Sequence, residues 1–311
     1  MFQLIALKNA FYPQAGIGIS ANSVLLSLHI SMFSVGPKPK LTDLTVTHLA
    51  VVHIVMLLTM GLLLSKDLWG ARDAQSNIWC KVIVFLNKLM RGLSIATTGL
   101  LSTLQAITIS PSSSWLAQFK CRSPHFLLCF SLFIWALTSC ICSNLLLYTV
   151  AAPNETQPGL LFLTDHCSFL PMSSVHRALF FTLMTFRDVF FIGLMAVSSG
   201  YMTLVLYRHA RRSQHLHSLS CSPRSSPEKR ATKTILLLVS CFVIGYCVDI
   251  IISVSTGTTW TNDPILVCIQ ILVSHGYCTV SPLVLIRADK HIIEIMQNIW
   301  ERNSNWLRKF I

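Results

Sequence analysis

The segment from Cys80 to Pro111 places three cations on an otherwise apolar stretch that is long enough to cross a lipid bilayer. Lys81, Lys88 and Arg91 are separated by seven and three residues, so on a helix they lie near one stripe. A cation at membrane depth is costly and normally faces a bundle interior or a wet cavity. The segment therefore predicts a membrane-spanning helix with a polar inner face.

The composition of the whole chain is typical of a polytopic membrane protein. Of its 311 residues, 53% are hydrophobic and 12% are charged, whereas a soluble domain usually carries about 25% charged residues. In such a protein the net charge of +12 is first a signal of orientation, not of nucleic-acid binding. We therefore expect an all-α, multi-pass protein of the plasma membrane whose partner is the lipid bilayer, with no nucleic acid and no cofactor.

Seven apolar runs, separated by polar or Pro-containing connections, predict a seven-transmembrane helix bundle. The bundle forms a single domain over residues 1–311. The expected spans are approximately residues 10–35, 42–64, 78–109, 125–150, 179–207, 231–254 and 264–286.

The distribution of Lys and Arg orients this bundle. About sixteen of them follow spans one, three, five and seven, against about four in the other connections, so the N-terminus is expected outside and the C-terminus inside. The single Asn-x-Thr acceptor, at Asn154, then falls in an outer loop, and we predict that it is glycosylated.

Two of the eleven cysteines are expected on the oxidising outer side, where disulfides form. Cys80 begins span three and Cys167 lies in the second outer loop. A disulfide between them is expected, with Cys268, near the outer end of span seven, as the main competing partner.

Four short motifs stand out in the spans: Arg91-Gly92-Leu93-Ser94-Ile95, the run from Leu100 to Pro111, His48-Leu49-Ala50 and Ser281-Pro282-Leu283-Val284-Leu285-Ile286. The seven spans and the cysteine pair resemble a G-protein-coupled receptor, and the motifs are similar to those of the vomeronasal type 1 receptors, the pheromone-receptor family. Gln105-Ala106-Ile107 replaces the acidic-Arg-aromatic triplet of rhodopsin-like receptors, which also favours this family.

The resemblance implies a receptor for pheromone-like small molecules that couples to a heterotrimeric G protein of the Gi/Go type. The nearest alternative is a bitter-taste receptor, which has a somewhat similar start to span six at Lys229-Arg230-Ala231. A small transporter is a more distant alternative. An enzyme is not expected, because no His-Glu-x-x-His motif or similar catalytic cluster occurs.

Buried ionisable residues are the candidates for function, and two interpretations of them remain open. In the first, they surround an outer ligand pocket together with aromatic side chains. In the second, Arg91 pairs with Asp188 or Asp249 and holds the helices together. Asn22 and His53 are expected to form interhelical hydrogen bonds. The candidate pocket residues are Lys88, Arg91, Asp188, Asp249, Phe85, Phe186 and Phe190, and those expected to contact G protein or lipid are Arg208, Arg211, Arg212, Lys229 and Arg230.

Overall fold

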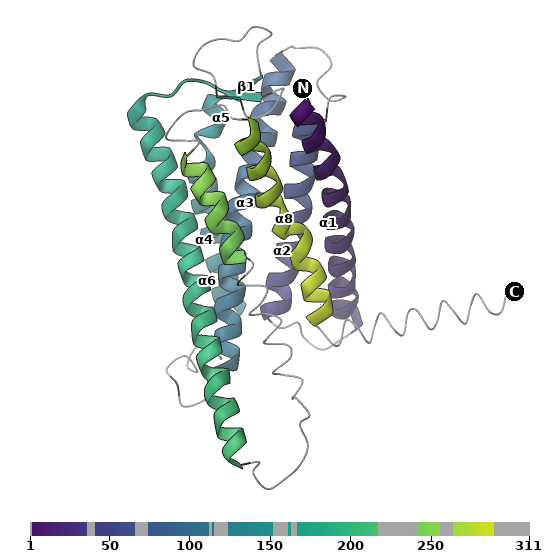
Figure 1. The fold of residues 1–311 in the computed structure, drawn as a ribbon, viewed down its shortest axis with the longest axis vertical. Coiled ribbons are helices and arrows are strands. Elements are labelled where there is room, and N and C mark those ends of the chain that lie inside the picture. Colours follow the sequence, from purple (N-terminus) through teal and green to yellow (C-terminus); the bar gives the residue numbers. More distant parts are fainter. Residues whose placement is uncertain are drawn as a thin grey trace, which may run out of the picture.

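In the computed structural model, long helices run side by side and form a bundle (Figure 1). The helices are α1 (Phe2–Val35), α2 (Leu41–Leu64), α3 (Ala74–Ile109), α4 (Pro124–Cys142), α5 (Leu145–Tyr148), α6 (Ser174–Leu216) and α8 (Pro264–Ala288), with a further helix at Phe242–Ser255. The structure describes residues 2–35, 41–65, 74–111, 114, 124–151, 161–162, 167–216, 240, 242–255 and 264–288.

Six helical segments are long and apolar enough to cross a membrane, and they coincide with six of the seven expected spans. The helix Phe242–Ser255 lies in the expected sixth span and is shorter than the other six. The helical membrane fold is therefore confirmed, while the seventh crossing and the orientation remain predictions. The six segments are Asn9–Phe33, Leu41–Leu64, Asn77–Ile109, Leu128–Tyr148, Ser174–Arg208 and Ile265–Arg287.

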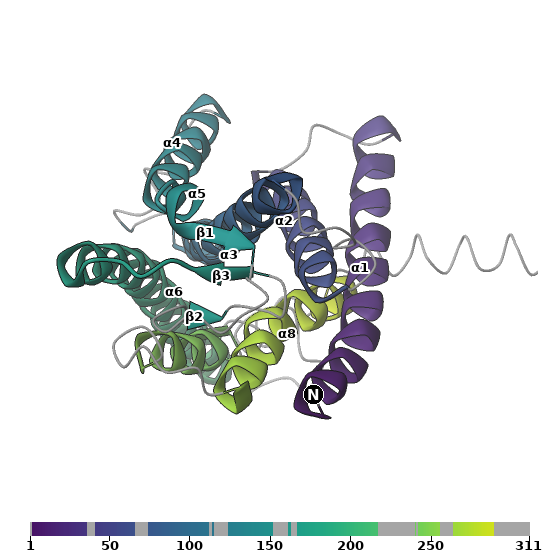
Figure 2. The ribbon, with the colours of Figure 1, turned by 90° about the horizontal axis from the view of Figure 1, so that it is seen from above.

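Helix α3 lies in the middle of the bundle, with α2, α4 and α6 packed around it (Figure 2). Every residue from Leu89 to Gly99 is buried. A helix buried all round must satisfy its polar side chains internally. Thr98 does so within α3 by donating to the carbonyl of Ser94, whereas the Ser94 side chain is 2.8 Å from His53 Nε2 of α2. The small and polar residues of this stretch therefore join α3 to its neighbours.

A small antiparallel sheet covers one end of the bundle, next to the start of α3 (Figure 1). Its order is β1-β3-β2, and Cys80 of α3 forms a disulfide with Cys167 of β3, which confirms the expected pairing. Asn77 of α3 also accepts a hydrogen bond from the backbone N–H of Ala151, at 2.7 Å. The strands are β1 (Thr149–Ala151), β2 (Leu161–Phe162) and β3 (Cys167–Phe169).

The fourth membrane-length segment, Leu128–Tyr148, is not one uninterrupted helix. Helix α4 ends at Cys142, a turn follows at Ser143 and Asn144, and α5 leads into β1. The backbone of β1 pairs with β3, which removes its last residues from the helix. Because these strands are only three residues long, their pattern is too short to distinguish from an apolar helix end.

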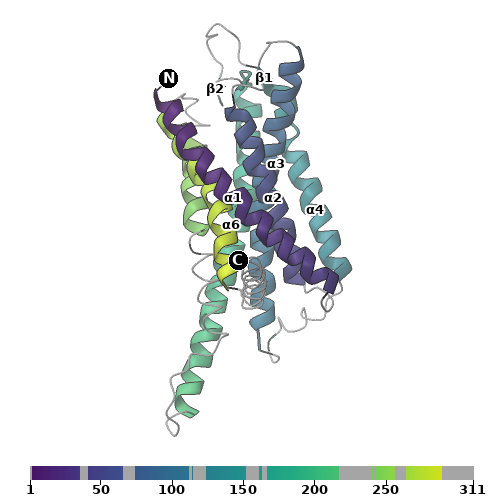
Figure 3. The same ribbon diagram turned by 90° about the vertical axis from the view of Figure 1, so that its right-hand side faces the viewer.

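Helix α1 lies across α2 and α8 (Figure 3). Asn22 Nδ2 donates to the carbonyl oxygen of Cys278 at 2.9 Å, and His53 also approaches Ser281 Oγ at 3.3 Å. Both residues thus form the expected interhelical hydrogen bonds. Pro282 lies inside α8, which continues to Ala288, so this proline does not end the helix.

Candidate functional site

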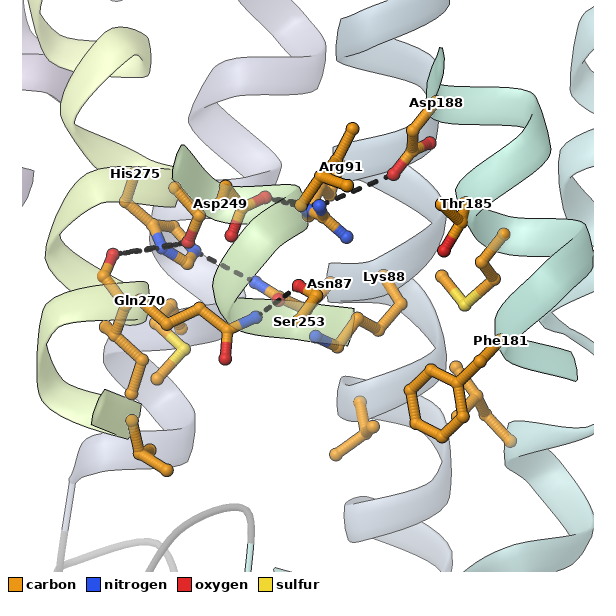
Figure 4. A pocket seen from close by; sticks show the side chains of 18 of the residues that line it. Asn87, Lys88, Arg91, Phe181, Thr185, Asp188, Asp249, Ser253, Gln270 and His275 are labelled. Carbon is orange, nitrogen blue, oxygen red and sulfur yellow. Dashed lines mark hydrogen bonds and ion pairs between the residues drawn. The ribbon is translucent and has the colours of Figure 1, made fainter. Parts of the chain in front are cut away.

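A cavity of about 130 Å³ lies between α3, α6, the helix Phe242–Ser255 and α8, in the half of the bundle nearest the sheet. Figure 4 shows charged and amide side chains from these four helices directed into the same space. Phe169 of β3 and Leu145 of α5 also line it, so the sheet end of the bundle forms one wall. The cavity therefore joins a polar centre to an apolar rim.

One wall of the cavity carries a buried ion network around Arg91. Arg91 Nε donates to Asp249 Oδ2 at 2.8 Å, and Arg91 Nη2 contacts the same oxygen. The same Nη2 is 3.4 Å from Asp188 Oδ2. Since Asp188 belongs to α6 and Asp249 to the helix Phe242–Ser255, one guanidinium connects three helices. Arg91 thus pairs with both carboxylates that the structural interpretation of these charges named.

Arg187 is a fourth member of this network, and the sequence did not single it out as a site residue. Its Nε and Nη2 donate to Asp188 Oδ1 at 2.9 and 2.7 Å, although Arg187 is 3% exposed. Gly92 leaves the space that its guanidinium occupies, because a Cβ at position 92 would lie 2.5 Å from Arg187 Nη1. In the sequence, Arg187 could have been identified from its position next to Asp188 in an apolar segment, and from the small residue Gly92 next to Arg91.

Lys88 lines the cavity one turn from Arg91, and its side chain reaches into the cavity (Figure 4). Among the described residues, its ammonium group has no hydrogen-bond or ion-pair partner. Lys81, on the same expected stripe, is half-buried and does not line the cavity. Only two of the three cations that define span three therefore face this space.

Neutral polar groups on the far wall were also missed by sequence reasoning. Asn87 Nδ2 donates to the carbonyl of Met56 and to Thr59 Oγ1, both at 3.0 Å, and is 3.4 Å from His275 Nε2. His275 Nδ1 donates to the carbonyl of Ile271 at 2.8 Å, so its Nε2 faces the Asn87 amide as an acceptor. These contacts connect α2, α3 and α8 behind the cavity.

The aromatic part of the expected pocket needs correction. Phe186 and Phe190 are 71% and 58% exposed and point away from the bundle interior, and Phe85 packs into the hydrophobic core. Phe180 and Phe181 line the cavity instead. Positions 186 and 190 lie four apart on the outward face of α6, whereas Phe180, Met184 and Asp188 follow its inward face.

Few of the expected cytosolic contacts can be placed. Arg208 and Arg211 are exposed near the C-terminal end of α6. This end of α6 extends past the bundle, away from the sheet (Figure 1). Arg212 follows in the same helix. Lys229, Arg230 and the acceptor Asn154 lie outside the described residues.

The buried charges face one another inside the bundle, and large apolar side chains such as Phe186 and Val197 cover its outside. Together with the six membrane-length helices, this arrangement defines a multi-pass membrane protein.

Comparison with known proteins then identifies the family. Residues 5–298 match the model of the vomeronasal organ pheromone receptor family. The chain is 43% identical to vomeronasal type-1 receptor 51 of Mus musculus over 293 residues, which cover 94% of this chain and 91% of that receptor. It is 42% identical to vomeronasal type-1 receptor 94 of Rattus norvegicus over 299 residues, which cover 96% and 91%.

The chain belongs to the vomeronasal type 1 receptor family, a family of pheromone-sensing G-protein-coupled receptors. The predicted resemblance is thereby confirmed in preference to the bitter-taste and transporter alternatives. The relatives are receptors and not enzymes. The family implies a ligand, a G protein and a lipid bilayer as partners.

Proposed function

We propose that this receptor binds a pheromone-like small molecule in the cavity beside Arg91 and transmits binding to a heterotrimeric G protein of the Gi/Go type. The observation that carries the proposal is the ion network of Arg91, Asp188 and Asp249 on the cavity wall. A ligand in the cavity lies against side chains that tie α6 and the helix Phe242–Ser255 to α3. Ligand contacts and helix contacts therefore share the same charged groups.

The proposal includes seven spans in one receptor domain over residues 1–311, with the N-terminus outside the plasma membrane and the C-terminus inside. The excess of cations after the odd-numbered spans supports this orientation. The disulfide Cys80–Cys167 supports it as well, because disulfides form on the oxidising side. The start of α1 lies at the same end of the bundle as β1 (Figure 1), which is the end assigned to the outside.

Signal transfer follows from differential binding to two conformations. A ligand shifts an equilibrium only when it interacts more favourably with one conformation than with the other. A ligand that binds beside Arg91, Asp188 and Asp249 favours a conformation in which the ion network is rearranged and the inner ends of α6 and the following helix separate from α3. The cations Arg208, Arg211, Arg212, Lys229 and Arg230 then contact the G protein and anionic lipid.

The test is a ligand response in cells that express the full chain with reporters for the different G-protein classes. We expect responses to small apolar molecules that pertussis toxin, an inhibitor of Gi/Go coupling, abolishes. Asp249→Asn keeps the shape of the side chain and should reduce the ligand response more than it reduces delivery to the cell surface, with Lys81→Gln as the control. Equal loss of response and delivery would assign Asp249 a structural role only, and ligand-driven ion flux without a G-protein response would contradict the proposal.

A further inference from the structure

Three cations and two carboxylates meet at the cavity wall among the described residues: Lys88, Arg91, Asp188 and Asp249 line the cavity, and Arg187 lies beside it and pairs with Asp188. Arg91 and Arg187 share the carboxylates of Asp188 and Asp249, so two cations are matched by two anions. Lys88 lines the same cavity, and within the portion of the chain that the structure describes no carboxylate lies within ion-pair distance of its ammonium group. Among these described residues, Lys88 is the cation without a carboxylate partner.

The position of Lys88 makes an unmatched charge unfavourable. It lies eleven residues into the segment Asn77–Ile109, which corresponds to about 16 Å along the helix axis. At that depth a charged side chain normally faces a partner or a water-filled cavity, and Lys88 faces the cavity. An anion that enters the cavity from outside supplies the missing partner, and its binding is strengthened by the low dielectric of the site.

We propose that Lys88 binds the anionic group of the ligand, so that this receptor recognises small organic acids through a carboxylate. The inference rests on the proposed ligand cavity and assigns separate roles to its cations. Lys88 contacts the ligand, whereas Arg91 is occupied by two carboxylates of the protein. Ser253 accepts a hydrogen bond from Gln270 Nε2 at 2.6 Å, which leaves its hydroxyl hydrogen to donate to the same carboxylate (Figure 4).

The remaining walls define the rest of the ligand. Phe180, Phe181 and Met184 provide an aromatic and thioether surface on α6, opposite the polar residues of α8. A volume of about 130 Å³ is close to that of an apolar cavity of ~150 Å³ that holds a single benzene molecule. The cavity therefore fits an acid with one ring or a short branched chain.

The experiment measures binding to the purified full-length receptor in lipid nanodiscs, without a G protein. The probes are phenylacetate, its methyl ester and 2-phenylethylamine, which share one ring but differ in charge. We expect phenylacetate to bind more tightly than both analogues. Lys88→Met should weaken phenylacetate binding at least tenfold and leave the ester unchanged, and Lys88→Arg should restore most of the affinity.

Lys81→Met is the matched control, because Lys81 is on the same helix and does not line the cavity. The inference is overturned if the ester or the amine binds as well as the acid, if no probe binds, or if Lys81→Met has the same effect as Lys88→Met. Binding is also measured in chloride and in gluconate buffers, to test whether the site takes an inorganic anion. Chloride that binds as tightly as phenylacetate would also overturn the inference. If the ester binds as tightly as the acid and Lys88→Met does not weaken it, the role of Lys88 is rejected but the ligand cavity is still supported. The two proposals can therefore fail separately.

Discussion

Arg91 of α3 and Asp249 of the helix Phe242–Ser255 are 158 positions apart in the chain and form a buried hydrogen bond of 2.8 Å between Nε and Oδ2. Neither side chain is more than 7% exposed. Their contact brings the middle of the third membrane helix against a helix that the sequence places near the C-terminal end of the bundle. Asp188 of α6 approaches the same guanidinium, so this point of the bundle depends on three helices at once.

The pair is expected to behave as a coupled unit in mutagenesis. Asp249→Ala removes one partner and should lower stability by about 3–5 kcal/mol, because it leaves a buried charge without its main counter-charge. The double substitution Arg91→Met with Asp249→Leu should cost less than the sum of the single changes. Thermal unfolding of the purified receptor measures these differences, and additive losses would show that the two residues are not coupled.

Gly92 is expected to be required for stability, because its lack of a side chain leaves space for the Arg187 guanidinium. Gly92→Ala places a methyl group 2.5 Å from Arg187 Nη1, so the guanidinium must move and its pair with Asp188 weakens. We expect a loss of about 1–3 kcal/mol in the same unfolding measurement. Gly193→Ala is the control, since no atom lies within 4 Å of a Cβ there. Equal effects at both positions would reject the steric explanation.

Gly18 is expected to set the distance between α1 and α8. A Cβ at this position would lie 2.7 Å from both Thr279 Oγ1 and Leu57 Cδ1. Gly18→Ala should therefore separate the helices and reduce stability and surface delivery, because small residues permit close helix approach in membranes. Gly16→Ala meets no atom within 4 Å and should be neutral or slightly stabilising. Surface labelling of the two variants, side by side, provides the comparison.

The disulfide is expected to stabilise the outer end of the bundle. Cys80→Ser should destabilise the receptor by about 2–5 kcal/mol, because β3 is then no longer attached to α3. Cys268→Ser should have little effect, since Cys268 is a free thiol. Maleimide labelling under non-reducing conditions checks the pairing. New labelling of Cys167 in the Cys80 variant is the expected result, and labelling of Cys167 in the wild type would contradict it.

The orientation is tested by glycosylation. We expect Asn154→Gln to remove a glycan, which appears as faster migration on a gel, and enzymatic deglycosylation of the wild type should give the same shift. As a control, Ser218→Asn creates a second acceptor sequence in the basic loop assigned to the cytosol. A glycan at position 218, or none at Asn154, would reverse or remove the support for an outside N-terminus.

The sequence predicted part of the arrangement that the structure shows, and these predictions have a common reason. Arg91, Asp188 and Asp249 were identified because a charge in an apolar helix must face a partner or a cavity, whatever the rest of the fold. Cys80 and Cys167 were paired because both fall on the oxidising side. Each inference used a constraint that the membrane imposes on any chain, so it needed no knowledge of how the helices pack.

The failures involve direction around a helix and contacts between distant segments. Phe186 and Phe190 were assigned to the pocket, but each lies two positions from Asp188, and side chains two positions apart on a helix are about 200° apart around its axis, on nearly opposite sides. They face outward, and Phe180 and Phe181 face the cavity. Asn87 was missed because its acceptors on α2 become neighbours only in the bundle.

The sequence by itself determined that this chain enters a membrane as a series of helices, and it indicated which ionisable groups must be inside. Long apolar runs leave the backbone no alternative to helices in lipid, because each N–H and C=O must be satisfied within the segment. Only the tertiary structure decided that Arg91 is held by two carboxylates while Lys88 has none among the described residues. Those distances depend on the rotation and packing of four helices, which are set by close contacts such as Gly92 against Arg187 and not by any local pattern.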